Sequence, residues 1–152
     1  MAVYLMRHGT CLPKNVDPYR PLSAEGEREV EMVARVVAAY KVHPSAVRHS
    51  GKLRARQTAE IMASYLNVDV SIGEMGGLLP EDDAVIFAES LRGDENTVYV
   101  GHLPFMERAV SYAITGDPTV PVLIFQTASC ICLENDGQTG RWVVRWAVIP
   151  PL

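Results

Sequence analysis

Cysteine is scarce in this sequence of 152 residues, where only Cys11, Cys130 and Cys132 are present. An odd number of cysteines, two of them on the same face of one expected strand, does not fit the disulfide frameworks that stabilise small secreted domains. We therefore expect all three thiols to be reduced.

Long hydrophobic runs and an excess of positive charge are also absent. No apolar stretch approaches the roughly 20 residues that a membrane-spanning helix needs. Strand-like sequence begins directly at Ala2, without a basic leader or a signal-peptide core. The 14 Lys and Arg residues face 18 Asp and Glu residues, which gives a formal net charge of −4 and argues against general binding of nucleic acid. The sequence thus predicts a cytoplasmic protein that binds neither membranes nor nucleic acid.

The chain does have enough apolar material for one packed core. Its hydrophobic share of 48% over 152 residues fits a single domain covering residues 1–152. Apolar runs and helical periodicity alternate along the chain. Strands are expected at residues 2–6, 46–49, 68–72 and 97–100, and helices from an N-cap at Ser23 to about residue 41, at 52–66, at 82–91 and from Pro104 onward.

The last part of the chain changes character. From residue 120 the helical stripes stop, and strand-like runs follow at 122–126, 129–133 and 141–148. Asn135-Asp136-Gly137 is a strong turn signal between the last two runs. We therefore expect a three-layer α/β/α fold with a mostly parallel sheet and an antiparallel hairpin at the C-terminus.

Two histidines directly follow predicted strands. His8 comes just after the strand at 2–6, and His102 comes just after the strand at 97–100. A third loop begins at Ser50, after the strand at 46–49. Because the carboxyl ends of parallel strands meet at one edge of a sheet, these loops are expected to form one crevice. Basic residues expected near this rim are Arg7, Lys14, Arg20, Lys52, Arg54 and Arg56, and such a crevice suits a phosphoryl group.

His8 has the properties of a phosphoryl acceptor. A neutral imidazole has an ordinary pKa of about 6.5 and needs no separate base near pH 7. Arg7 and Arg54 offer planar guanidinium groups for bidentate contacts with phosphoryl oxygens. His102, if protonated, adds another donor, and Gly9 permits a close backbone approach. These residues together predict phosphoryl transfer through His8.

The remaining histidines and the cysteines do not indicate a second site. His43 and His49 lack such neighbours and are expected to be structural or surface residues. A cysteine phosphatase needs an arginine soon after its nucleophile, yet none follows Cys11 until Arg20.

Four segments, in chain order, resemble the motifs of a known family. They are Leu5-Met6-Arg7-His8-Gly9-Thr10, Arg20-Pro21-Leu22-Ser23 with Gly26, Ser50-Gly51-Lys52-Leu53-Arg54-Ala55-Arg56-Gln57-Thr58-Ala59, and Val100-Gly101-His102-Leu103-Pro104. The first resembles the Arg-His-Gly signature of the histidine phosphatase superfamily, which includes the phosphoglycerate mutases. The whole set resembles its short bacterial branch, the SixA-type phosphohistidine phosphatases.

The resemblance implies a phosphoglycerate mutase-like fold and a role for each motif residue. His8 becomes the phosphorylated nucleophile, Arg7 and Arg54 the phosphate clamp, and His102 the second histidine that bonds the phosphoryl oxygens. The residues expected to bind substrate are Arg7, Gly9, Ser50, Arg54 and His102. The resemblance also implies that neither a metal nor another cofactor takes part.

One departure from the family concerns the general acid. Many phosphomonoesterases of the superfamily supply a carboxylic acid from the region before the last histidine, and that region is short here. The candidates are Glu74 and the Glu81-Asp82-Asp83 cluster, with Glu81 and Asp82 foremost. We interpret them first as a solvated loop and a helix N-terminus.

The weak case for an acid bears on the substrate. An alkoxide leaving group needs a proton donor, whereas a protonated phosphohistidine ring leaves as neutral imidazole. Short insertions also leave no lid around a small metabolite. The sequence therefore predicts phosphohistidine on a protein as the substrate. Two alternatives stay open, namely a small-molecule phosphomonoesterase with Glu81 or Asp82 as acid, and a non-catalytic phosphate-binding module.

Overall fold

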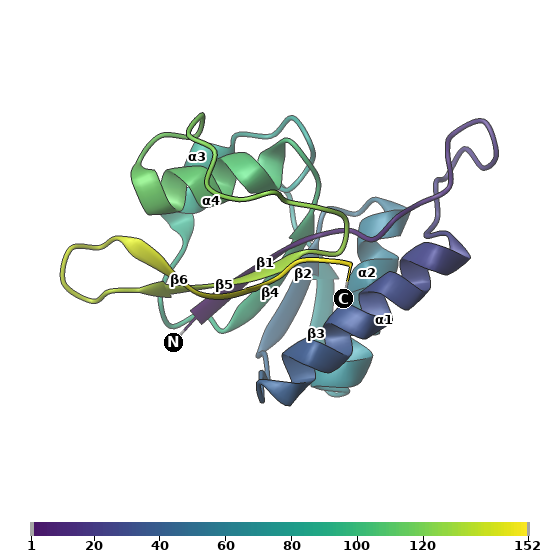
Figure 1. Cartoon of the computed structure of the whole chain (residues 1–152), viewed down its shortest axis with the longest axis horizontal. Coiled ribbons are helices and arrows are strands. Elements are labelled where there is room, and N and C mark those ends of the chain that lie inside the picture. The colour runs from purple at the N-terminus through teal and green to yellow at the C-terminus, as the bar shows by residue number, and fades with distance from the viewer. Residues whose placement is uncertain (1, 152) are drawn as a thin grey trace.

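A six-stranded mixed sheet forms the centre of the computed structural model, which describes residues 2–151 (Figure 1). The strands are β1 (Ala2–Arg7), β2 (Ala46–His49), β3 (Ser71–Glu74), β4 (Thr97–Gly101), β5 (Cys130–Asn135) and β6 (Trp142–Val148). Their order is β3-β2-β4-β1-β5-β6. The first four strands in this order are parallel, whereas β5 and β6 add antiparallel pairs. The predicted C-terminal hairpin is confirmed.

Helices cover both faces of this sheet. They are α1 (Ala24–Ala39), α2 (Leu53–Leu66), α3 (Ala84–Ser90) and α4 (Phe105–Thr115). Figure 1 shows α1 and α2 on one face and α3 and α4 on the other. The predicted three-layer α/β/α architecture is therefore confirmed. No helix within residues 2–151 has the length and apolar character needed to cross a membrane.

Burial on both faces of the sheet explains why β1 is apolar from Ala2 to Met6. Val3 and Leu5 lie in the core beneath α3 and α4, whereas Tyr4 and Met6 lie in the core beneath α1 and α2. Successive side chains of a strand point to opposite faces, so a strand that is covered on both sides must be apolar at every position. This burial holds β1 at the centre of the sheet, and His8 emerges at its end.

Side-chain caps define where two helices begin. The hydroxyl of Ser23 accepts the Gly26 N–H at 3.0 Å, as predicted for the start of α1. The Asp83 carboxylate accepts the N–H groups of Val85 and Ile86 at 3.0 and 3.1 Å, and α3 therefore begins two residues later than expected. Such caps satisfy N–H groups that have no partner within the helix.

One predicted strand is shifted along the chain, and another is absent. β3 begins at Ser71 and not at Val68, because the side chain and carbonyl of Asn67 accept the N–H groups of Asp69 and Val70 in a turn. The run at 122–126 is a loop. Since β4 and β5 already occupy both sides of β1, this run finds no strand partner in the sheet centre. It crosses instead above the end of β1, where Phe125 is buried.

Candidate active site

The ends of β1, β2 and β4 meet at one edge of the sheet, as the sequence predicts. Arg7 pairs with Gly101 across β1 and β4, and His49 pairs with Val100 across β2 and β4. His8, Ser50 and His102 therefore leave the sheet side by side. A cavity of about 420 Å³ lies at this edge, and it is lined by Arg7, His8, Thr10, Cys11, Arg20, Arg54, Pro80, His102, Leu103 and Thr127.

His8 is held as a neutral imidazole with one free nitrogen. Its Nδ1 lies 2.7 Å from the Gly9 carbonyl oxygen, which can only accept, so Nδ1 carries the proton. The lone pair is thereby left on Nε2. Burial lowers the pKa of His8 to about 4, and the charges of Arg54 and Arg7 act in the same direction. At pH 7 the ring is unprotonated at Nε2, as a nucleophile must be.

His102 is also neutral, which differs from the protonated form considered above. Burial lowers its pKa to about 3, with His8 and Arg54 adding to the effect. Its Nε2 lies 2.6 Å from Ser50 Oγ, which in turn accepts the Lys52 N–H at 3.3 Å. When the Ser50 hydroxyl donates to Nε2 of His102, the ring proton lies on Nδ1. The rings of His8 and His102 lie 5.1 Å apart, centroid to centroid.

Three buried polar atoms around this cavity have no partner among the residues that the structure describes. They are Nε of Arg7, Nε of Arg54 and Nδ1 of His102, and all three are nitrogens that can donate a hydrogen bond. Buried polar groups are rarely left unpaired, so an unpaired set needs an explanation. Arg7, Arg54 and His102 also line the cavity, and side chains that offer several hydrogen-bond donors suit a multiply charged oxyanion such as a phosphoryl group.

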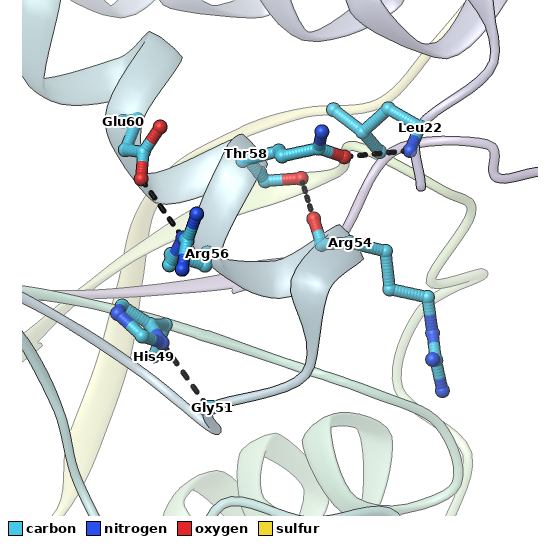
Figure 2. Close-up of polar contacts among 8 residues, drawn as sticks. Leu22, His49, Gly51, Arg54, Arg56, Thr58 and Glu60 are labelled. Carbon is cyan, nitrogen blue, oxygen red and sulfur yellow. Dashed lines mark hydrogen bonds and ion pairs between the residues drawn. The ribbon is translucent and has the colours of Figure 1, made fainter. Parts of the chain in front are cut away.

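The two guanidinium groups reach the cavity from different elements. Arg7 ends β1, and its Nη1 donates to the Phe125 carbonyl at 2.9 Å. The loop at 122–126, which is not the predicted strand, thereby orients Arg7. Arg54 lies in the first turn of α2, and its side chain extends away from the helix (Figure 2).

Two residues close to Arg54 in the sequence, Arg56 and His49, do not line the cavity (Figure 2). Arg56 forms an exposed ion pair with Glu60 at 3.1 Å and does not line the cavity. His49 is structural, as predicted, because its buried ring accepts the Gly51 N–H at 3.1 Å. Of the basic residues expected at the rim, Arg7, Arg20 and Arg54 line the cavity, whereas Lys14, Lys52 and Arg56 do not.

The other predicted site residues have definite places. Gly9 packs tightly, since a Cβ there would lie 2.6 Å from the side chain of Val30. Ser50 contacts His102 and does not itself line the cavity. Neither Glu81 nor Asp82 lines the cavity, and the carboxylate of Asp82 accepts the Leu79 N–H at 2.8 Å.

Sequence reasoning gave no role to two residues that belong to this environment. Arg20 lines the cavity, and its guanidinium lies 3.4 Å from both Cys11 Sγ and the Leu12 carbonyl oxygen. Thr58 lies beneath the cavity and contacts the main chain of Gly9. Both residues lie within the four segments that resemble the family motifs, and this was the signal that could have identified them. Motif membership did not show which way either side chain points.

Within the described part of the chain, no group of three or more His, Cys, Asp or Glu side chains is arranged to hold a metal ion.

Comparison with known proteins is consistent with this geometry. Residues 3–75 match the family model for the histidine phosphatase superfamily (branch 1). The chain is 29% identical over 156 residues to the phosphohistidine phosphatase SixA of Escherichia coli K12, covering 99% of this chain and 94% of that protein.

Solved structures agree. The structure of the protein histidine phosphatase SixA complexed with tungstate matches with a TM-score of 0.83 and 28% identity, covering 97% of this chain and 96% of that one. A phosphoserine phosphatase from Entamoeba histolytica, complexed with 3-phosphoglyceric acid, matches with a TM-score of 0.72. It covers 98% of this chain and 97% of that one, and at 13% identity it shares the fold alone.

Proposed function

This chain belongs to the histidine phosphatase superfamily and is a phosphatase with a histidine nucleophile, and we propose that its substrate is phosphohistidine on a protein. In this proposal His8 is the nucleophile, Arg7 and Arg54 form the phosphate clamp, and His102 donates to the phosphoryl group. The similarity to SixA, which is named as a phosphohistidine phosphatase, supports the substrate class.

The first step transfers the phosphoryl group to His8. The Nε2 lone pair attacks phosphorus while the N–P bond of the substrate breaks. The substrate imidazole, already protonated on its other nitrogen, keeps the electron pair of that bond and leaves as a neutral ring. In this proposal Arg7 and Arg54 neutralise the charge on the equatorial oxygens, and the His102 ring donates a hydrogen bond to them.

The second step returns His8 to its starting form. A water oxygen attacks phosphorus, the bond to Nε2 breaks, and that electron pair stays on the ring. Both water protons leave on dihydrogen phosphate, so His8 is again neutral with its proton on Nδ1. The Gly9 carbonyl, 2.7 Å from Nδ1, stabilises the cationic ring of the phosphorylated intermediate.

Our choice of substrate rests mainly on the composition of the cavity wall. Over the residues that the structure describes, the wall holds three arginines and two histidines but no Asp or Glu. An alkoxide leaving group would need an acid at this place, whereas a protonated imidazole leaves without one. The wall therefore suits an N–P bond better than a phosphate ester.

A comparison of substrates tests this proposal. Purified protein is given a phosphohistidine-bearing protein and, separately, a panel of sugar and nucleotide phosphates, and release of inorganic phosphate is measured. We expect a much higher kcat/KM for the phosphohistidine protein. A clear preference for the small esters would overturn the substrate class but not the nucleophile. Intact-protein mass spectrometry after rapid quenching then shows whether His8 carries the phosphoryl group.

A further inference from the structure

The hydroxyl of Thr58 joins the two segments that carry the proposed nucleophile and clamp. Thr58 lies in the second turn of α2 and has no exposed surface. Its Oγ1 accepts the Gly9 N–H at 3.1 Å and donates to the Arg54 carbonyl oxygen at 2.8 Å (Figure 2 shows the second bond). Both hydrogen-bonding roles of this one oxygen are therefore filled by residues next to or within the site.

Three hydrogen bonds, joined through the backbone of Gly9, connect the Arg54 carbonyl to the ring of His8. Thr58 donates to Arg54 and accepts from Gly9, and the Gly9 carbonyl accepts Nδ1–H of His8 at 2.7 Å. The last bond sets which ring nitrogen of His8 is free to attack. A displacement of Gly9 that breaks this bond would remove the contact that orients the His8 ring and holds its proton on Nδ1.

The main chain around His8 depends on Thr58 for one of its fixed points. The His8 N–H donates to the Gly101 carbonyl at 3.0 Å, and the His8 carbonyl accepts the Ala128 N–H at 3.1 Å. These bonds anchor His8 to β4 and to the segment before β5. Contact with α2, which carries Arg54, comes through the Gly9 N–H, whose hydrogen-bond partner is the Thr58 hydroxyl.

We infer that Thr58 is a positioning residue that holds the His8 ring and the Arg54 clamp in register through a single hydroxyl. This inference rests on the roles proposed above for His8 and Arg54. The positioning role depends on the oxygen of Thr58, which makes the two hydrogen bonds. The methyl group only fills space in the core. A variant that keeps the volume and loses the oxygen separates the two contributions.

Two pairs of variants make that separation. Thr58→Val removes the hydroxyl at nearly constant volume. Thr58→Ser and Thr58→Ala differ from each other by the same oxygen in a smaller side chain, so they carry the comparison if Thr58→Val does not fold. Thr97→Val is the matched control, because Thr97 is also buried but begins β4 at the far end from the site. Folding of each variant is checked by circular dichroism.

The assay uses phosphoramidate, a small N–P donor, as the probe. We expect Thr58→Val to lower kcat by up to about 100-fold, as misplacement of a reacting group does, with a far smaller change in KM. Thr58→Ser and Thr97→Val should stay close to the wild type, and Thr58→Ala should fall below Thr58→Ser. Proton–nitrogen NMR of the labelled imidazoles should show His8 losing its preference for the Nδ1–H tautomer in Thr58→Val.

Several results would overturn the inference. They are normal kcat in Thr58→Val, equal impairment of the Ser and Ala variants, or a loss of kcat with the His8 tautomer unchanged. A wild-type protein that turns over phosphoramidate without phosphorylating His8 would overturn the proposed function instead. The two failures are thus distinguishable.

Discussion

The Oγ of Ser50 lies 2.6 Å from Nε2 of His102, and a Ser50 hydroxyl that donates to Nε2 places the ring proton on Nδ1. Because the pKa of His102 is lowered to about 3, the ring donates only through the nitrogen that Ser50 leaves protonated. We expect Ser50→Ala to lower kcat by about 3- to 10-fold, the effect of one hydrogen bond. Phosphate release from phosphoramidate measures it. Ser64→Ala, at an exposed helix position, is the control, and an unchanged kcat in Ser50→Ala would contradict the role.

His8→Ala should abolish turnover, because no other side chain is proposed to attack phosphorus. Quench-flow mass spectrometry should show a phosphorylated wild type and no phosphorylated variant. The control is His43→Ala, which removes an exposed imidazole that contacts the Leu66 carbonyl. Turnover in His8→Ala near the wild-type rate would show that the nucleophile lies elsewhere.

Arg54→Ala should lower kcat by about 100- to 1000-fold, in line with the loss of one donor to a transition-state oxyanion. Arg56→Ala removes the same charge from the same helix, but its side chain is 57% exposed and paired with Glu60. Exposed pairs of this kind contribute little to stability. We therefore expect Arg56→Ala to behave like the wild type in steady-state assays. Equal losses in both variants would mean that Arg54 acts only through the general positive potential.

Arg20→Ala should weaken phosphate binding more than it slows chemistry. The guanidinium lines the cavity and donates only long hydrogen bonds, of 3.4 Å each, to the Leu12 carbonyl and Cys11 Sγ, which an anion in the cavity can replace. Competitive inhibition by inorganic phosphate measures the effect, and we expect the inhibition constant to rise by about tenfold, as the loss of a charged hydrogen bond implies. A phosphate inhibition constant equal to that of Arg56→Ala would exclude direct contact.

Stability should fall as the pH is lowered from about 6.5 toward about 4. His8 has a folded-state pKa of about 4 against an ordinary value of 6.5. Between these values the unfolded chain binds a proton at His8 that the folded chain does not, so lower pH favours unfolding. Urea unfolding at pH 7 and pH 5 measures the difference. In His8→Asn the decrease should be smaller, and an identical decrease would show that His8 is not the cause.

The same pKa shift predicts the acid limb of catalysis. Attack needs neutral His8, and with a pKa of about 4 the ring stays neutral well below pH 6.5. For a donor whose ionisation is constant over this range, kcat/KM should remain level at pH 5.5. A decline centred near pH 6.5 would contradict the burial of His8.

Apolar runs covered on both faces made the central strands and the overall layers predictable. The run at 2–6 and the apolar stripe of α2 have no other stable environment than a core. The errors occurred where local pattern was weaker than local hydrogen bonding. Val68 is 79% exposed because the polar groups of Asn67 form a turn there, although its neighbours alternate like a strand. The run at 122–126 has a strand-like sequence, but a strand also needs a hydrogen-bonding partner in the sheet. Which partners are available depends on the whole sheet and cannot be read from the run itself.

For the site, sequence alone determined which chemical groups are available. Arg7 ends a strand, and His8, Arg54 and His102 follow strands that end at the same edge of a parallel sheet, which made these four residues identifiable. Only the tertiary structure decided their protonation and orientation. Burial keeps both imidazoles neutral, the Gly9 carbonyl and the Ser50 hydroxyl each contact one nitrogen of a ring, and Thr58 connects the loop after β1 to α2. These properties depend on desolvation and on contacts between distant segments, which no local pattern encodes.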